Sequence, residues 1–262
     1  MKRLVIAILI LIPVLVAVDF GAAAITESAV SRVMRSQLGL ADDPSVRING
    51  FPFLAQAAAD EYSSVDVEAQ NISVGPLREV GVRAQLRAVK APLPMLLGPG
   101  PKTLQVQVAE GVVRIPADDV ERLVPGVAKL RIETVDDFAL EQAIDGGADV
   151  AIADIDPDLA VRLVGSSVLF GRSELAVIAA LELADGEIRI VPRDIRLTGG
   201  GANQLPAAVQ QQLQRLFTLR IDPGALPLQV TPTKLRAVNG GLEISGRTRN
   251  LTLGDAASAS GG

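Results

Sequence analysis

The sequence contains no cysteine, no histidine and no tryptophan. A disulfide framework is therefore impossible, and zinc sites built on thiolate or imidazole ligands are excluded. The Ser-His-Asp and Cys-His systems of nucleophilic catalysis are excluded in their usual form. The acyl anchor of a lipoprotein is excluded too, because it is attached to a cysteine. The sequence therefore predicts no catalytic residue, no metal site and no cofactor.

Aromatic residues are scarce, and the net charge is negative. Tyr62 is the single tyrosine, six phenylalanines are present, and 48% of the residues are hydrophobic. Such a chain builds its interior from aliphatic side chains, which suit acyl chains and an ordinary packed core equally well. A net charge of −5 argues against nucleic acid as a partner and against purely electrostatic attachment to anionic lipid. Membrane contact should therefore be mainly apolar, or local to the strands that carry arginine.

The N-terminus has the pattern of an export signal. Lys2 and Arg3 precede an apolar run from Leu4 to Val18, and the small residues Ala22 to Ala24 follow. The segment from Asp19 to Leu38 continues as a predicted helix. Its expected apolar face comprises Ile25, Ala29, Val33 and Met34. Residues 1–24 are therefore either a cleaved signal peptide or an uncleaved signal-anchor, and the pattern leaves both open.

Beyond residue 40 the hydrophobic period is two, which is typical of strands with one buried face. Val65–Gln70, Val82–Ala88 and Leu104–Val108 all alternate in this way. A polar residue before glycine also recurs between alternating segments, and this pattern indicates hairpins because glycine accepts a positive φ. The three predicted hairpins are Leu104–Pro116, Ala180–Pro192 and Leu235–Gly246.

Four short helices are expected to cover this sheet. They are Ala117–Val124, Asp136–Ile144 with Phe138 as a core contact, Asp156–Val164, and Pro206–Leu216. The paired carboxylates Asp42-Asp43, Asp118-Asp119 and Asp136-Asp137 are interpreted as solvated caps and turns, since aspartate is favoured at these places for local reasons. A buried, converging pair would instead indicate a hydrolase or transferase that uses carboxylates alone.

Met95, Leu96 and Leu97 stand in a loop bounded by proline and glycine. Exposed apolar clusters usually mark interaction sites, so one interpretation is a rim that touches lipid. The other is a loop folded onto the core. The tail 254–262 is rich in Ala, Ser and Gly and is expected to be disordered. Residues 25–253 are expected to form a single lipid-binding domain.

The most specific local string runs from Val46 to Gln56 and contains Gly-Phe-Pro-Phe-Leu, with Tyr62 following. This string resembles the actinobacterial LmeA-like family of envelope phospholipid-binding proteins. The order of an export segment, a helix to about Leu38 and glycine-turn hairpins is similar as well, as is the end, from Leu226 to Gly246.

The resemblance implies an α+β fold in which a curved antiparallel sheet of repeated hairpins wraps helices around an apolar groove, similar to tubular lipid-binding folds. It implies phospholipid as the partner, including phosphatidylinositol-type lipids, and a supporting role in the assembly of mannose-containing envelope glycolipids of the lipomannan type. The expected location is the periplasmic side of the plasma membrane. Protein partners are not indicated.

Within the string, Phe51, Phe53 and Leu54 are candidate lipid-binding residues, together with Met95, Leu96 and Leu97 of the loop. Pro52 should hold its neighbours in an extended conformation, so that the two rings point to opposite sides. One ring would then pack inward while the other faces a groove; in the alternative, both pack in the core. A non-catalytic envelope scaffold with a fully packed interior is the alternative function.

Overall fold

The computed structural model describes most of the chain. The described residues are 2–92, 94, 104–124, 126–145, 152–167, 173–184, 187–198, 213–214, 217–221 and 232–253. Three predictions fall wholly or mostly outside them: the loop with Met95, Leu96 and Leu97, the tail 254–262, and the helix Pro206–Leu216.

The chain divides into two compact units. Unit 1 comprises Met1–Gln70, Val82–Gly111 and Arg247–Gly262, and unit 2 comprises Asn71–Gly81 and Val112–Gly246. The family resemblance covers residues of both units. The single domain expected for residues 25–253 stays a prediction.

In the part of the chain that the structure describes, the strands form a six-stranded and a five-stranded sheet. The six-stranded sheet has the order β1-β2-β3-β4-β11-β10. Its strands are β1 (Ser45–Asn49), β2 (Glu61–Val74), β3 (Leu77–Lys90), β4 (Leu104–Pro116), β10 (Pro232–Val238) and β11 (Gly241–Leu253). β1 pairs with β2 in antiparallel register, with Ser45 opposite Glu68 and Asn49 opposite Ser64.

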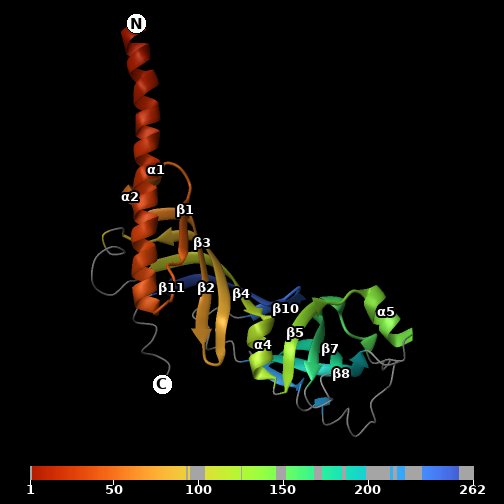
Figure 1. Ribbon diagram of the computed structural model, residues 1–262. Helices are drawn as coiled ribbons and strands as arrows, with labels where there is room; N and C mark the ends of the chain where they lie inside the picture. Colours follow the sequence, from red (N-terminus) through yellow and green to blue (C-terminus); the bar gives the residue numbers. More distant parts are fainter. Residues whose placement is uncertain are drawn as a thin grey trace. The chain divides into compact units, whose positions relative to one another are not determined.

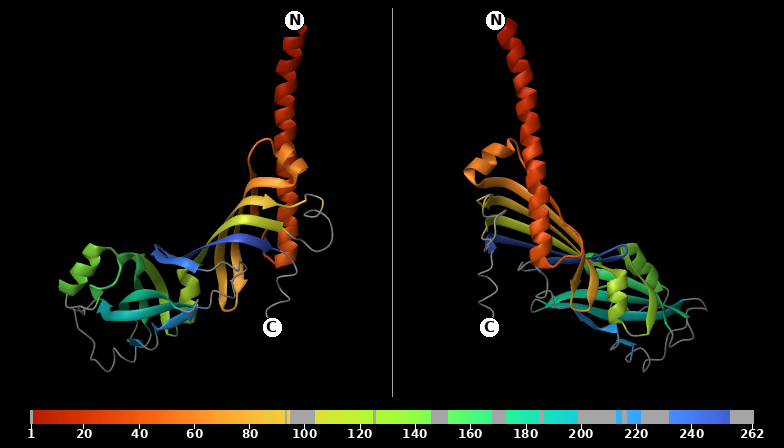
Figure 2. Two further views of the ribbon diagram at one scale, coloured as in Figure 1. Left: turned by 180° about the vertical axis from the view of Figure 1, so that it is seen from behind. Right: turned by 60° about the vertical axis from the view of Figure 1, so that its left-hand side comes forward.

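Unit 1 contains two helices beside its strands, α1 (Lys2–Leu38) and α2 (Phe53–Ala59). The C-terminal half of α1 lies beside the strands of this unit, and its N-terminal half extends beyond them (Figures 1 and 2). One core cluster of the unit consists of the buried residues Phe53, Tyr62, Leu86, Val89, Ala91, Val106 and Ala109. Ala22 and Ala23 of α1 and Ala57 of α2 pack against this cluster, so both helices contribute to the core.

Unit 2 is built on an antiparallel five-stranded sheet of order β5-β6-β7-β8-β9. The strands are β5 (Val127–Thr134), β6 (Ala160–Ser167), β7 (Ser173–Ala184), β8 (Glu187–Thr198) and β9 (Leu219–Ile221). The largest fully buried side chains include Leu163, Leu175, Leu181, Ile188, Ile190 and Ile195 of this sheet. Helix α4 (Ala117–Leu123) contacts β5, and β10 contacts β5, β6 and β7.

The fold class is confirmed: the protein is α+β, with helices beside antiparallel sheets. Two of the predicted hairpins are confirmed as well. β7 pairs with β8 so that Ala184 lies opposite Glu187, and β10 pairs with β11 across Asn239-Gly240. Gly240 has a φ of +82°, which glycine adopts without the strain that other residues would carry.

The predicted hairpin at Leu104–Pro116 is wrong, because these residues form one continuous strand, β4. Glu110 and Gly111 were expected to turn. Instead, the Glu110 carboxylate lies between two neighbouring strands, 3.9 Å from the Arg87 guanidinium on β3 and 3.3 Å from Arg247 on β11. A polar residue before glycine therefore indicates a turn only where the segments before and after it pair with each other. The segments before and after Glu110-Gly111 belong to one strand that pairs with β3 and β11 instead.

The helix predicted at Asp156–Val164 is also wrong. Asp156 does cap a helical turn, since its carboxylate accepts a hydrogen bond from the backbone N–H of Asp158. That turn, η2 (Pro157–Leu159), ends after three residues, and β6 begins at Ala160. Pairing with β5 on one side and β7 on the other overrides the local helix signal.

Helices α4 and α5 (Asp137–Asp145) are confirmed, but two of their side chains differ from expectation. Phe138 is 69% exposed rather than a core contact, and Leu140 is the buried residue of α5. Asp119 in the first turn of α4 is not a solvated cap, because it is wholly buried. Ile25 of α1, expected on one apolar face of the predicted helix, is exposed.

Candidate lipid-binding site

Helix α2 begins within the Gly-Phe-Pro-Phe-Leu string and holds Phe53 and Leu54 in its first turn, whereas Phe51 precedes it. Its N-cap, Pro52, offers no side-chain hydrogen bond to the first turn. A residue far away in the sequence does so instead. The Asp19 carboxylate of α1 accepts hydrogen bonds from the backbone N–H groups of Phe53 and Leu54, each at 2.8 Å. A carboxylate at a helix N-terminus satisfies donors that the helix itself cannot satisfy.

The two phenylalanine rings have different environments. Phe53 is 3% exposed and stacks on Tyr62, with ring centroids 6.3 Å apart. Phe51 is 61% exposed and stacks on Phe20 of α1 at 6.0 Å. Phe53 begins α2, so the extended conformation expected there is wrong, although one ring is buried and the other exposed. Leu54 is also exposed.

Three buried polar atoms of unit 1 have no hydrogen-bond partner among the described residues. They are Gln56 Nε2, Tyr62 Oη and Ser64 Oγ. Burial raises the pKa of the Tyr62 phenol, and the charge of Asp60 adds to this effect. Buried polar groups are normally paired, so these atoms mark a place where polar groups of water or of a ligand would gain hydrogen bonds. Sequence reasoning did not identify them.

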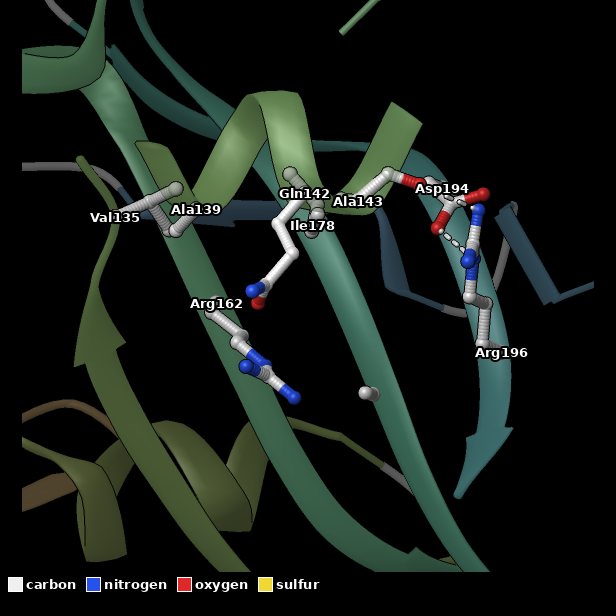
Figure 3. Close-up of a pocket in the computed structure, with 9 residues that line it drawn as sticks. Val135, Ala139, Gln142, Ala143, Arg162, Ile178, Asp194 and Arg196 are labelled. Atoms are coloured by element: carbon white, nitrogen blue, oxygen red, sulfur yellow. Dashed lines mark hydrogen bonds and ion pairs between the residues drawn. The ribbon is translucent and has the colours of Figure 1, made fainter. Parts of the chain in front are cut away.

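A pocket of about 190 Å³ lies in unit 2, between α5 and the five-stranded sheet (Figure 3). Its apolar lining consists of Val135, Ala139, Ala143, Ala176 and Ile178. Its polar lining consists of Gln142, Arg162, Asp194 and Arg196. The strand register explains why these polar residues meet, because Arg162 on β6 and Asp194 on β8 both lie opposite Ile178 of β7. The name "α5 pocket" is used below for this set.

The two arginines of the α5 pocket differ in the hydrogen bonds and ion pairs that they make. The Arg196 guanidinium donates hydrogen bonds to the Asp194 carboxylate at 2.7 Å and to the backbone carbonyl of Ala143 at 3.2 Å. Arg162 Nε lies 3.8 Å from a carboxylate oxygen of Glu133, and this carboxylate is also 3.8 Å from Arg131. Exposed ion pairs of this length are worth little, so Arg162 can turn its guanidinium toward an anion at small cost. In Figure 3 the Gln142 side chain extends from α5 toward Arg162.

A second pocket, of about 250 Å³, lies on the strands of unit 1. Its lining mixes the polar residues Lys90, Gln105, Gln107 and Asn250 with the apolar Val106 and Leu251. Pockets for whole small-molecule ligands usually hold about 300–1,000 Å³, so each of these two fits part of a phospholipid rather than all of it. The continuous apolar groove stays a prediction.

The structure thus brings Phe51 and Leu54 to the surface beside α1 and leaves Phe53 in the core. It also places in unit 2 a pocket that sequence reasoning missed. The signal was present: Arg162 stands between Val161 and Leu163, and alternation in a strand would have put it on the opposite face from both. The helix expected at this place concealed it.

These observations define a class: an α+β protein with antiparallel sheets, aliphatic cores and a small apolar pocket rimmed by arginine. The model of the LmeA-like phospholipid-binding family matches residues 17–247. The chain belongs to this family, and the resemblance seen in the sequence is confirmed. Searches of the curated proteins and of the solved structures found no match.

Proposed function

We propose that the protein is an exported, non-catalytic phospholipid carrier or presenter on the periplasmic side of the plasma membrane. Family membership supports phospholipid binding itself. The observation that carries the finer proposal is the α5 pocket, in which an apolar floor stands beside the Arg162 guanidinium. A guanidinium is suited to phosphate because its N–H groups match the phosphate oxygens in pairs.

The α5 pocket suits the phosphate and glycerol end of one lipid. Arg162 would bind the phosphate, and Gln142 would donate to or accept from a neighbouring hydroxyl or ester oxygen. Val135, Ala139 and Ile178 would contact the first methylenes of the acyl chains. Phosphatidylinositol is the headgroup proposed, because it combines an anionic phosphate with hydroxyls within reach of an amide.

The biological role proposed is support of mannose-containing glycolipid assembly of the lipomannan type. This part rests on the family resemblance and on the export pattern of the N-terminus. The lack of histidine and cysteine supports a binding role rather than covalent catalysis.

An envelope scaffold without lipid is the second candidate. One observation favours it: the side chains of Leu163, Ile188 and Ile190 in the five-stranded sheet are at most 1% exposed, as in a fully packed interior. The two candidates differ in what purified protein carries, since a scaffold would bind no phospholipid.

Arg162→Gln should weaken binding of short-chain phosphatidylinositol about tenfold, because a charge-assisted hydrogen bond contributes about 1.5–3 kcal/mol and 1.4 kcal/mol is a factor of ten. Titration calorimetry of the whole chain measures this. The matched control is Arg193→Gln, which removes an arginine of similar exposure on β8 that pairs with Glu182 at 3.1 Å and does not line the α5 pocket. Equal affinities of the two variants would contradict the assignment of the headgroup to Arg162.

A further inference from the structure

Helix α1 exposes an apolar surface long enough to cross a bilayer. Its large apolar residues from Leu4 to Val18 are mostly exposed, and the helix meets the length and hydropathy of a membrane span from Lys2 to Ser36. Lys2 and Arg3 stand at its start. Basic residues beside a span favour the cytoplasmic side, so this orientation directs the rest of the chain outward.

Asp19 interrupts the apolar sequence, but it does not interrupt the apolar surface. The residue is 5% exposed, and its carboxylate is occupied by the two N–H groups of α2. The exposed apolar surface resumes directly with Phe20, 63% exposed, and continues to Ile25, 73% exposed. Leu4 to Phe20 spans about 25 Å at ~1.5 Å per residue, close to the ~30 Å of a hydrocarbon core, so Phe20 stands near the far edge of the span.

Helix α2 adds to the same surface at the far end of this span. Phe51 stacks on Phe20, and Leu54 follows in the first turn of α2. The name "α1–α2 corner" is used for Phe20, Phe51 and Leu54. Three exposed apolar residues together are unfavourable in water and usually mark an interaction surface.

The residues that suggest a cleavage site in the sequence are packing residues in the structure. Ala22 and Ala23 are helical and pack against the core cluster of unit 1. Cleavage after Ala24 would remove both of them, and it would remove Asp19 and Phe20 as well. Two α2 N–H groups would then lose their acceptor, and Phe51 would lose its stacking partner.

The rest of α1 is held by polar contacts along one stripe of the helix. Glu27 accepts a hydrogen bond from the backbone N–H of Ile48 at 2.7 Å. Ser31 donates to the backbone carbonyl of Pro44 at 2.5 Å, and Arg35 pairs with Asp43 at 3.4 Å. Glu27, Ser31 and Arg35 are spaced by four residues and therefore lie along one side of the helix. This face fixes the rotation of the helix and leaves its apolar faces outward.

We infer that α1 is a permanent membrane anchor rather than a removable leader, and that the α1–α2 corner is seated in the outer interface of a phospholipid bilayer. The Asp19 contact with α2 couples the anchor to the folded unit. The inference deepens the proposed membrane location, but it is independent of the α5 pocket, so either can fail without the other.

The mass of the purified protein shows whether α1 has been retained or cleaved. The full chain is expressed in a bacterial host with an intact export pathway, extracted from membranes with detergent, and analysed by intact mass spectrometry. The expected mass is that of the complete chain, 27.3 kDa. A product that has lost its first residues up to the alanine run would overturn the inference.

Tryptophan fluorescence measures how deeply the α1–α2 corner lies in the bilayer. The chain has no tryptophan, so a single introduced tryptophan is the only source of this emission. Phe51→Trp is compared with Leu38→Trp, an exposed position near the end of α1 and about 20 Å along the helix from Ile25. The full chain is placed in vesicles of phosphatidylcholine brominated on its acyl chains. Emission of the Phe51→Trp variant should fall about twofold, whereas that of Leu38→Trp should not change, because tryptophan at a bilayer interface lies near the acyl chains.

Equal quenching at both positions, or none at Phe51→Trp, would overturn the placement of the corner. Both substituted side chains are exposed, so the fold should tolerate them, and unchanged thermal melting of each variant confirms this. Binding of short-chain phosphatidylinositol is measured in the same samples. Loss of quenching with intact lipid binding would reject the placement of the α1–α2 corner alone, and the reverse result would reject the α5 pocket alone.

Discussion

Phe53→Ala should destabilise the protein by about 3–5 kcal/mol, whereas Phe51→Ala should cost about 1 kcal/mol or less. The two rings are separated by one residue in the sequence and differ in environment. Phe53 is buried against Tyr62 in the core cluster of unit 1, and its removal leaves a cavity. Phe51 loses only an exposed stacking contact with Phe20.

Urea unfolding of the full chain in detergent, followed by far-ultraviolet circular dichroism, measures both values. The slope of the free energy of unfolding against urea concentration should be the same in the two variants. The difference between their unfolding midpoints then measures the difference in stability. Similar stability losses at both positions would show that both rings belong to the core, and would remove Phe51 from the lipid-contacting surface.

Asp119→Ala should lower the free energy of unfolding by about 3–6 kcal/mol, because hydrogen bonds to a charged acceptor contribute about 1.5–3 kcal/mol each and two are lost together here. The Asp119 carboxylate accepts hydrogen bonds from the backbone N–H groups of Arg78 at 2.9 Å and Glu79 at 2.8 Å. It also pairs with Arg122, whose guanidinium reaches Glu79 at 2.8 Å. The side chain thus joins α4 to the start of β3.

Asp118→Ala is the matched control, since this neighbour lies in the same first turn of α4 and is exposed. It should cost no more than about 0.3–1 kcal/mol, the usual contribution of an acidic residue near a helix N-terminus. The measurement is the same unfolding experiment on both variants. Equal losses in the free energy of unfolding for the two variants would contradict this prediction. They would show that Asp119 contributes only as a surface charge and that its contacts between α4 and β3 do not stabilise the protein.

The sequence predicted the secondary structure correctly where the local pattern agreed with the strand pairing and packing of the folded protein. Alternation predicted the strands around Val67, Leu86 and Val106, and Asn239-Gly240 predicted the turn between β10 and β11. Pro116 before two acidic residues predicted α4. In each of these places, strand alternation, turn geometry or helix capping depends on neighbours within a few residues.

The wrong predictions share one cause. In each of them, the local structure is determined by a contact with residues far away in the sequence. Glu110 and Gly111 stay in a strand because β3 and β11 flank β4, and residues 160–164 form β6 because β5 and β7 flank it. Asp119 is buried by residues of β3. A local pattern carries no information about these partners.

The same reason explains what was missed at the candidate sites. The acceptor for the first turn of α2 is Asp19, more than thirty residues earlier in the chain. The α5 pocket requires β5, β6, β7 and β8 in register beneath α5. Phe51 and Leu54 could be named from the family string, but Phe20, the stacking partner of Phe51, could not, because it lies within a segment that has the pattern of an export signal.

Native mass spectrometry of the full chain, extracted from membranes in mild detergent, tests the central claim that this protein binds phospholipid. The account predicts an added mass corresponding to one diacyl phospholipid, which organic extraction releases intact and which phosphatidylinositol displaces more readily than phosphatidylcholine. Spectra that show only the bare polypeptide, together with no uptake of lipid from offered liposomes, would contradict it and leave the envelope scaffold as the function.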